Sequence, residues 1–187
     1  MVDLKILTMR QRMLDGQPFR TDDSGLARDR SMAQARETAF NEADQAADPA
    51  SLLAELATVG EGTRVRAPLH VEHGRRIAIG SGCEIAAGLV AQDFAEITIG
   101  NDVLIGANVQ LLTLTRPVQA EQRRAKWAAA SPVRIGDNVS LGAGVIVSPG
   151  VRIGDNTVVG AGSVVIGDLP AGVVAVGNPA KVIGTVS

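Results

Sequence analysis

The sequence predicts a mainly β protein, a parallel β-helix of six-residue repeats that follows a helical N-terminal segment. Three observations carry this prediction. Small or aliphatic residues recur at every sixth position of the C-terminal part, and the N-terminal part is rich in helix-forming residues. The third observation is the composition: 45% of the 187 residues are hydrophobic and only 2% are aromatic. A narrow interior filled by aliphatic side chains fits this composition better than an ordinary globular core, which usually includes large rings.

The first 58 residues are expected to form helices. Gly16 and Pro18 end the first of them, and Asp48-Pro49 separates the second from the third. Such a segment can serve simply as a cap on the β-helix or as packing between subunits. The expected helices cover residues 6–14, 26–47 and 51–57, and the residues suited to the N-cap of the second are Asp22, Asp23 and Ser24.

Residues 59–187 carry the repeat. Each unit is expected to give a short strand and a turn, and three units close a triangular coil of about 18 residues that pairs in parallel with the next coil. One aliphatic anchor per unit points inward, and the Gly that follows it tolerates the backbone of the turn, including positive φ. Asn and Asp pairs such as Asp137-Asn138 do the same. The anchors are Ile79, Ile99, Ile105, Leu111, Ile135, Leu141, Val147, Ile153, Val159, Val165 and Ala171.

The repeat lapses over residues 113–131, which are largely polar. Long loops on rigid scaffolds tend to carry function, so this segment is a candidate part of a site. A solvated surface loop without a function is an equally good interpretation at this point.

Charge and composition narrow the classes of partner. A formal net charge of −2 gives no case for binding nucleic acid or an anionic membrane. The lone Cys83 fits a reducing compartment, and neither a signal peptide nor an apolar stretch long enough to span a membrane is recognisable. We therefore expect a cytoplasmic protein.

Three motifs resemble one family of enzymes. Residues 12–19 read R-M-L-D-G-Q-P-F, residues 97–106 read I-T-I-G-N-D-V-L-I-G, and residues 177–183 read G-N-P-A-K-V-I. Together they are similar to the maltose O-acetyltransferase type of hexapeptide-repeat acyltransferases over nearly the whole chain. The resemblance implies a left-handed β-helix, a homotrimer, acetyl-CoA as co-substrate without a metal, and a small-molecule acceptor bound in clefts between neighbouring prisms.

The resemblance also shows where the chain departs from the family. The family's general base is a histidine in a T-x-T-H-P motif, and the matching residues 113–117 here read T-L-T-R-P, which places Arg116 at that position. A guanidinium stays protonated and cannot act as a base. The family's oxyanion-binding asparagine corresponds to Ala86, and its histidine-orienting glutamate falls within residues 128–130, which are all alanine.

Other family positions keep suitable residues. The resemblance assigns Glu72 and Asp93 to the acceptor site, and Gly142, Gly160 and Lys181 to acetyl-CoA. His73, beside Glu72, is a candidate for a relocated base because histidine titrates near neutrality. The alternative is a surface histidine in a turn between strand and coil.

Two functions remain open from the sequence. One is an acetyl-CoA-dependent O-acetyltransferase, impaired or atypical, that acts on a sugar or a small hydroxylated acceptor, with Arg116 binding an anionic acceptor or polarising an oxyanion. The other is a non-catalytic trimeric scaffold or ligand-binding protein. A zinc-dependent use of the same fold, of the carbonic anhydrase kind, needs three histidine ligands, and the chain has only His70 and His73.

Overall fold

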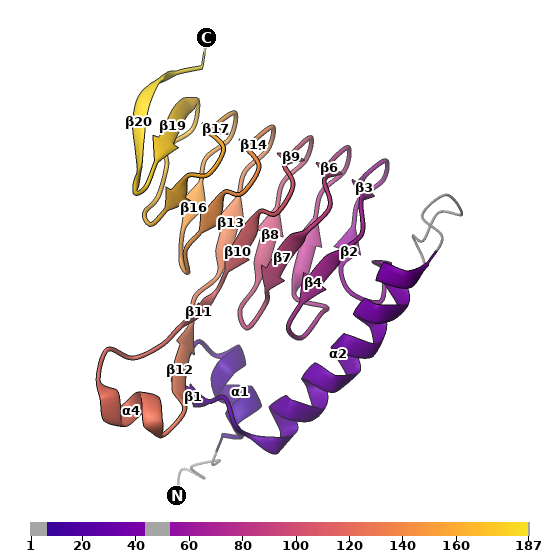
Figure 1. Cartoon of the computed structure of the whole chain (residues 1–187), viewed down its shortest axis with the longest axis vertical. Helices are drawn as coiled ribbons and strands as arrows, with labels where there is room; N and C mark the ends of the chain where they lie inside the picture. The colour runs from indigo at the N-terminus through magenta and orange to yellow at the C-terminus, as the bar shows by residue number, and fades with distance from the viewer. Residues whose placement is uncertain (1–6, 44–52, 187) are drawn as a thin grey trace, which may run out of the picture.

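The computed structural model describes residues 7–43 and 53–186. Three sheets form the faces of a triangular prism, and the chain winds around it coil by coil (Figure 1). Their strands pair in parallel, except in the antiparallel hairpin of residues 173–185. This architecture confirms the predicted left-handed parallel β-helix. The first sheet holds β2 (Thr58–Val59), β5 (Ile77–Ile79), β8 (Ile97–Ile99), β13 (Val133–Ile135) and β16 (Arg152–Ile153). The second sheet holds β4 (Leu69–Val71), β7 (Leu89–Gln92), β10 (Gln110–Leu112), β15 (Ile146–Val147) and β18 (Val164–Val165). The third sheet holds β3 (Arg64–Val65), β6 (Glu84–Ile85), β9 (Leu104–Ile105), β14 (Ser140–Leu141), β17 (Val158–Val159), β19 (Val173–Gly177) and β20 (Ala180–Thr185).

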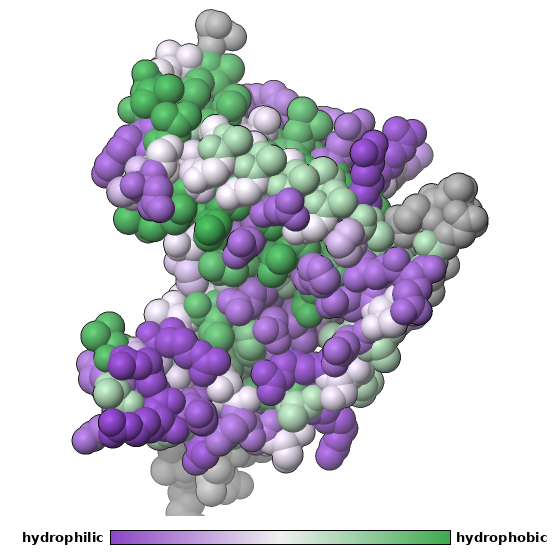
Figure 2. All heavy atoms as spheres, viewed as in Figure 1, coloured by the Kyte–Doolittle hydropathy of each residue, from purple (hydrophilic) through white to green (hydrophobic). Residues whose placement is uncertain are grey.

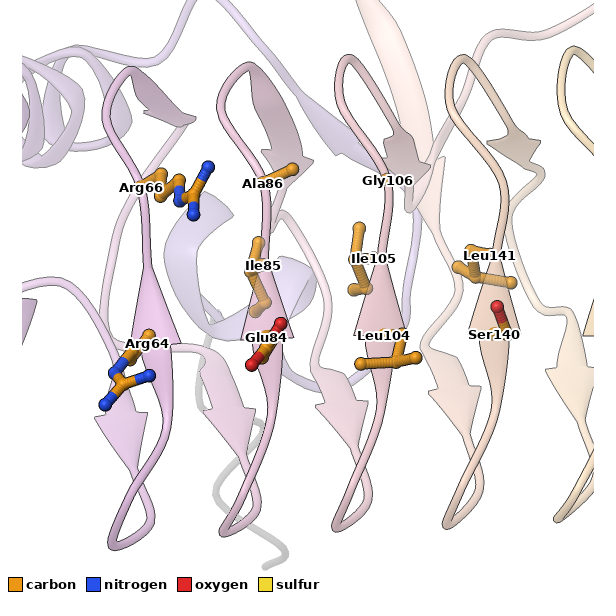
Figure 3. A pocket seen from close by; sticks show the side chains of 10 residues that line it. All are labelled: Arg64, Arg66, Glu84, Ile85, Ala86, Leu104, Ile105, Gly106, Ser140 and Leu141. Atoms are coloured by element: carbon orange, nitrogen blue, oxygen red, sulfur yellow. The ribbon is translucent and has the colours of Figure 1, made fainter.

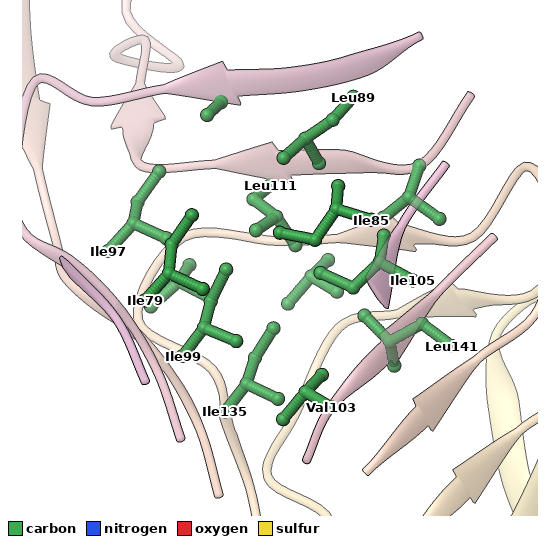
Figure 4. Close-up of a cluster of buried hydrophobic side chains, with 14 of the residues drawn as sticks. Ile79, Ile85, Leu89, Ile97, Ile99, Val103, Ile105, Leu111, Ile135 and Leu141 are labelled. Carbon is green, nitrogen blue, oxygen red and sulfur yellow. The ribbon is translucent and has the colours of Figure 1, made fainter. Parts of the chain in front are cut away.

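The interior of the prism is a ladder of aliphatic side chains. Ile85, Ile105 and Leu141 stack in register through parallel pairing of their strands, and all three are buried (Figure 4). Val139 and Val145, each two residues before an anchor, also point inward and are fully buried. Each six-residue unit therefore buries two side chains. Among the described residues, Phe40, which precedes the repeat, is the one aromatic ring in this core cluster.

Coil length varies along the prism. The Ser81 N–H donates to the Asn101 side chain 20 residues on, whereas the Asp137 N–H donates to Asp155 18 residues on. Near the C-terminus the Arg152 N–H donates to Asp168, only 16 residues on. In that short coil Leu169 takes the inward position, so the prediction that Ala171 is an anchor was wrong and Ala171 is exposed.

The turns confirm one backbone prediction and correct another. Asp102, Asn138 and Asn156, the second members of the acidic and amide pairs, all adopt positive φ. The Gly after an anchor has a different reason to be glycine. A Cβ on Gly100 would lie 2.7 Å from the backbone carbon of Gly136 in the next coil, so close stacking, and not positive φ, excludes a side chain there.

Two described helices precede the prism. Thr8 caps α1 (Met9–Leu14), and Asp23 caps α2 (Ser24–Glu42) by accepting from the N–H groups of Gly25 and Leu26. Both overlap the predicted helices 6–14 and 26–47, but α1 begins at Met9 and α2 runs from Ser24 to Glu42. The third predicted helix does not continue over residues 54–57, which are non-helical. Residue 6, residues 44–47 of the second predicted helix, the 48–49 break and residues 51–52 of the third lie outside the described residues.

The excursion from the repeat is a packed element. It contains β11 (Leu114–Thr115), α4 (Ala120–Arg124) and β12 (Trp127–Ala130), and β12 pairs in antiparallel fashion with β11 and with β1 (Phe19–Arg20). Figure 1 shows it projecting from the side of the prism next to α1. A second apolar cluster holds it there, made of Met13, Phe19, Leu26, Phe94, Ala128 and Ala130.

Candidate functional site

Helix α2 docks against β4, the edge strand of its sheet. The Asn41 side chain accepts from the Leu69 N–H at 2.8 Å and donates to the Leu69 carbonyl at 2.9 Å, as a neighbouring strand would. One turn earlier, Glu37 Oε2 accepts from the Val71 N–H at 2.8 Å. These side chains satisfy backbone groups that an edge strand otherwise leaves open, and they fix Glu37 beside the outer face of β4.

The second oxygen of Glu37 holds a histidine. Glu37 Oε1 lies 3.0 Å from Nδ1 of His70, whose side chain is 51% exposed while that of Glu37 is 18% exposed. His70 lies on the outer face of β4 because its neighbour Leu69 points into the core. The result is a carboxylate–imidazole pair at the surface.

A groove of about 510 Å³ runs between α2 and β4. Glu72, two residues after His70 and on the same side of the chain, is half-buried in it. Burial raises the pKa of Glu72 above its usual value, and the nearby charges of Arg30 and Arg116 lower that pKa by smaller amounts. Arg30 lines the groove with Glu72, whereas Arg116 lies outside its lining and acts on Glu72 through its charge.

Asp93 lies behind the groove and is fully buried. Its Oδ1 accepts from the N–H groups of Glu72 at 3.0 Å and His73 at 2.8 Å, so it shapes the backbone that presents Glu72. Burial raises the pKa of Asp93, and these backbone hydrogen bonds lower the pKa in part. Oδ2 has no hydrogen-bond partner among the described residues.

His73 is buried and is not the surface histidine that the sequence left as an alternative. Its side chain packs edge-on against the Phe94 ring, with ring centroids 4.9 Å apart, and only 6% of the residue is exposed. Burial, aided by the charge of Arg76, lowers the pKa of His73 to about 4. Neither ring nitrogen is solvent-accessible or hydrogen-bonded in the part of the chain that the structure describes, which does not favour a base that must reach a substrate.

Arg116 follows β11 and is exposed. Its Nη1 donates to the Oγ1 of Thr21 at 3.1 Å, and Arg30 donates to the Thr21 carbonyl at 3.2 Å. Two guanidinium groups from distant parts of the chain thus converge on one threonine beside the groove. Neither forms an ion pair within residues 7–43 and 53–186, so both remain able to meet an anionic group.

A second hollow, of about 370 Å³, lies on the outer face of the third sheet (Figure 3). Ala86, at the position that resemblance gave to an oxyanion-binding asparagine, lines it beside Arg66 and Gly106. A methyl group offers no hydrogen bond, so this hollow keeps the shape of a site without that donor.

The residues assigned to acetyl-CoA lie toward the C-terminal end of the prism. Gly142 and Gly160 follow β14 and β17 and stack on each other, and their N–H groups donate to Val159 and Ala175 within the β-helix. Lys181 is exposed on β20. Their places are compatible with a ligand along this edge, and their binding roles stay predictions.

The sequence missed His70 and Glu37. One signal could have found His70, because residues 70 and 72 alternate onto the same side of a strand. Glu37 lies 33 residues away on another element, and nothing in the local sequence indicates that α2 packs there. Over the described residues, no cluster of three His, Cys, Asp or Glu side chains is arranged to hold a metal, and no helix there is long and apolar enough to cross a membrane.

Two repeat families match parts of the chain. Residues 132–167 match the family described as bacterial transferase hexapeptide (six repeats), and residues 96–111 match the hexapeptide repeat of succinyl-transferase.

Relatives match nearly the whole chain. Nodulation protein L of Rhizobium meliloti is 40% identical over 180 residues, which cover 95% of this chain and 98% of that protein. A maltose O-acetyltransferase from Clostridium difficile superposes with a TM-score of 0.87 at 34% identity, over 97% of this chain and 98% of that one. A hexapeptide-repeat acetyltransferase from Vibrio cholerae complexed with acetyl-CoA superposes with a TM-score of 0.89 at 32% identity, over 97% of this chain and 100% of that one.

Proposed function

Because the chain belongs to the family of hexapeptide-repeat acetyltransferases, we propose that it transfers the acetyl group of acetyl-CoA to a hydroxyl of a sugar or another small acceptor. The observation that carries the proposal is the groove between α2 and β4. Glu72, His70 and Arg30 line a space of about 510 Å³, and the charge of Arg116 on the projecting element acts on the pKa of Glu72. Half-buried carboxylates are good partners for hydroxyl groups, and Asp93 fixes the backbone that presents one.

The enzyme is atypical in this proposal because Arg116 stands where the family has its base. Arg116 instead binds an anionic group of the acceptor or stabilises the negative oxygen that forms when the hydroxyl attacks the thioester. Its exposed guanidinium and the nearby Arg30 suit both roles. Gly142, Gly160 and Lys181 are proposed to line the path of acetyl-CoA.

We further propose a cytoplasmic homotrimer. Large apolar side chains are exposed at the C-terminal end over β19 and β20, where Figure 2 shows hydrophobic residues gathered, and Leu104 is 50% exposed on the third sheet. These side chains supply apolar area for contact between subunits. They are Val176, Val182, Ile183 and Val186.

The test is acceptor-dependent release of the CoA thiol. Acetyl-CoA is offered with a panel of hexoses, disaccharides and polyols, including acceptors that carry a carboxylate or a phosphate. We expect turnover by the unchanged protein, with a lower KM for anionic acceptors that rises in the Arg116→Gln variant. Absence of turnover with every acceptor contradicts the proposal.

One observation favours a second candidate, a trimeric protein that binds a ligand without acetyl transfer. Arg116 cannot accept a proton, and Ala86 cannot donate a hydrogen bond, so two groups expected of a catalyst are missing at the assigned positions. If this candidate function is the right one, the unchanged protein shows no acceptor-dependent release of the CoA thiol, whereas the Arg116→His variant does.

A further inference from the structure

The strongest unassigned feature is the pair formed by His70 and Glu37. A carboxylate 3.0 Å from Nδ1 favours the tautomer with a proton on Nδ1, and Nε2 is then the free acceptor of the ring. Within residues 7–43 and 53–186, Nε2 has no hydrogen-bond partner, and half of the side chain is open to solvent. An imidazole oriented in this way is equipped to take a proton from a bound molecule.

Glu37 is held firmly enough to orient the ring. Its other oxygen accepts from the Val71 N–H at 2.8 Å, and the Asn41 side chain ties the next turn of α2 to Leu69. Three hydrogen bonds thus connect this stretch of helix to the strand that carries His70. A carboxylate with both oxygens occupied has little freedom to swing away from the imidazole.

The pair opens onto the candidate acceptor groove. His70, Glu37, Glu72 and Arg30 all line it, and the charge of Arg116 reaches Glu72 from the projecting element. An acceptor bound to Glu72 therefore lies beside the exposed imidazole. By contrast, the nitrogens of His73 are closed off from the groove.

We propose that His70 is the general base of the reaction and that Glu37 is the residue that positions it, an inference that rests on the proposed acetyl transfer. His70 Nε2 takes the proton of the acceptor hydroxyl while its oxygen forms a bond to the thioester carbonyl carbon. The intermediate collapses, the carbon–sulfur bond breaks with its electron pair on sulfur, and the imidazolium returns the proton to the CoA thiolate. The products are an O-acetyl ester and free CoA thiol.

A different role for the pair is a surface ion pair that only fastens α2 to β4. Pairs of this kind near the surface contribute little to stability. The two roles differ in what a substitution changes. A fastening pair affects unfolding and leaves turnover intact, whereas a base affects kcat and leaves the fold intact.

The experiment compares four proteins by thiol release with the best acceptor of the panel. They are the unchanged protein, His70→Asn, Glu37→Gln and the control Glu42→Gln, which makes the same change at an exposed position of α2. We expect His70→Asn to lower kcat by about 10²–10⁴ with little change in KM. Glu37→Gln is expected to lower kcat less, and Glu42→Gln to match the unchanged protein.

Rescue separates a base from a structural residue. In His70→Gly, added imidazole is expected to restore part of the turnover in a saturable manner, with no effect on the unchanged protein. Full activity in His70→Asn, or failure of imidazole to restore His70→Gly, overturns the assignment of His70 and leaves acetyl transfer standing. Absence of turnover in the unchanged protein overturns the proposed function and the base together.

Discussion

Three acidic side chains around the groove show how position decides chemistry. Glu37 has both oxygens occupied by partners, and Asp93 is fully buried against backbone N–H groups. Glu72 is half-buried, and its carboxylate has no hydrogen-bond partner among the described residues. The first is suited to orient a neighbour and the second to shape the backbone. Only the third is suited to meet a ligand hydroxyl.

Glu72 is expected to make the free energy of unfolding depend on pH. Its pKa is raised in the folded protein, so ionisation favours the unfolded state. The stability it contributes is fully present below the unfolded pKa of about 4.3 and is lost as the pH rises through the folded pKa. Glu72→Gln removes this loss. The free energy of unfolding of the variant, relative to that of the unchanged protein, should therefore be more favourable at pH 7 than at pH 4.

Urea-induced unfolding at several pH values measures this difference. A difference that stays constant from pH 4 to pH 7, or that shrinks as the pH rises, would show that the carboxylate is not disfavoured by its surroundings.

For the individual residues of the site, the sequence indicated which side chains are candidates but not which of them contact one another. That Arg116 cannot act as a base is an expectation that follows from the side chain alone. The sequence left His73 between a base and a surface residue, and burial against Phe94 decided against the surface residue. This burial depends on contact with Phe94, whose position only the folded chain defines.

Among the elements, the projecting segment depends on a small core of its own. Phe19 is fully buried, stacks on Phe94 at 5.9 Å, and joins the strands β1 and β12 to α1 and α2. Ala128 and Ala130 complete this cluster, so the place where family resemblance expected a glutamate is occupied by tight apolar packing. Strand β12 packs the end of the segment into this cluster, while residues 118–126, including α4, are exposed as in the solvated loop that the sequence left open.

Phe19→Ala is expected to release the projecting segment while the prism persists. Loss of a buried Phe costs about 3–5 kcal/mol, and here the cost falls on the cluster that anchors residues 113–131. Limited trypsin digestion followed by mass spectrometry should show early cleavage at Arg123 and Arg124. Phe40→Ala, which opens the core at the end of the prism, serves as the comparison; equal cleavage patterns in the two variants would contradict a separate anchoring cluster.

The placement of α2 was beyond the sequence for a related reason. Its N-cap and its extent over the described residues followed from local signals. Its docking on β4 depends on side-chain contacts across 28 residues, from Asn41 to Leu69, and across 34 residues, from Glu37 to Val71. Periodicity has no information about such contacts.

Across the whole molecule, repetition made the fold predictable. Each coil buries two aliphatic side chains per unit and pairs with the next, so a period visible in the sequence becomes a stack in space. Coils of different length were less visible, because two added or removed residues change a turn without changing the inward pattern. The exposed Ala171 is the case where a regular period concealed a shorter coil.

Stacking distance makes a direct prediction about glycine. Gly100→Ala would place a methyl 2.7 Å from the Gly136 backbone and should destabilise the protein by about 1–3 kcal/mol through forced separation of coils. Gly167→Ala has nothing within 4 Å of the added carbon and should change stability by less than about 0.5 kcal/mol. Urea-induced unfolding of both variants checks the contrast, and equal effects would mean that coil spacing is not what requires the glycine.

We propose that this β-helix transfers acetyl groups although Arg116 stands at the position of the usual base. The most direct measurement is mass spectrometry of the acceptor after incubation of the unchanged protein with isotopically labelled acetyl-CoA. We expect an acceptor that carries one labelled acetyl ester, formed at a rate that depends on His70. An acceptor that remains unlabelled with the unchanged protein, and becomes labelled only with Arg116→His, would contradict it.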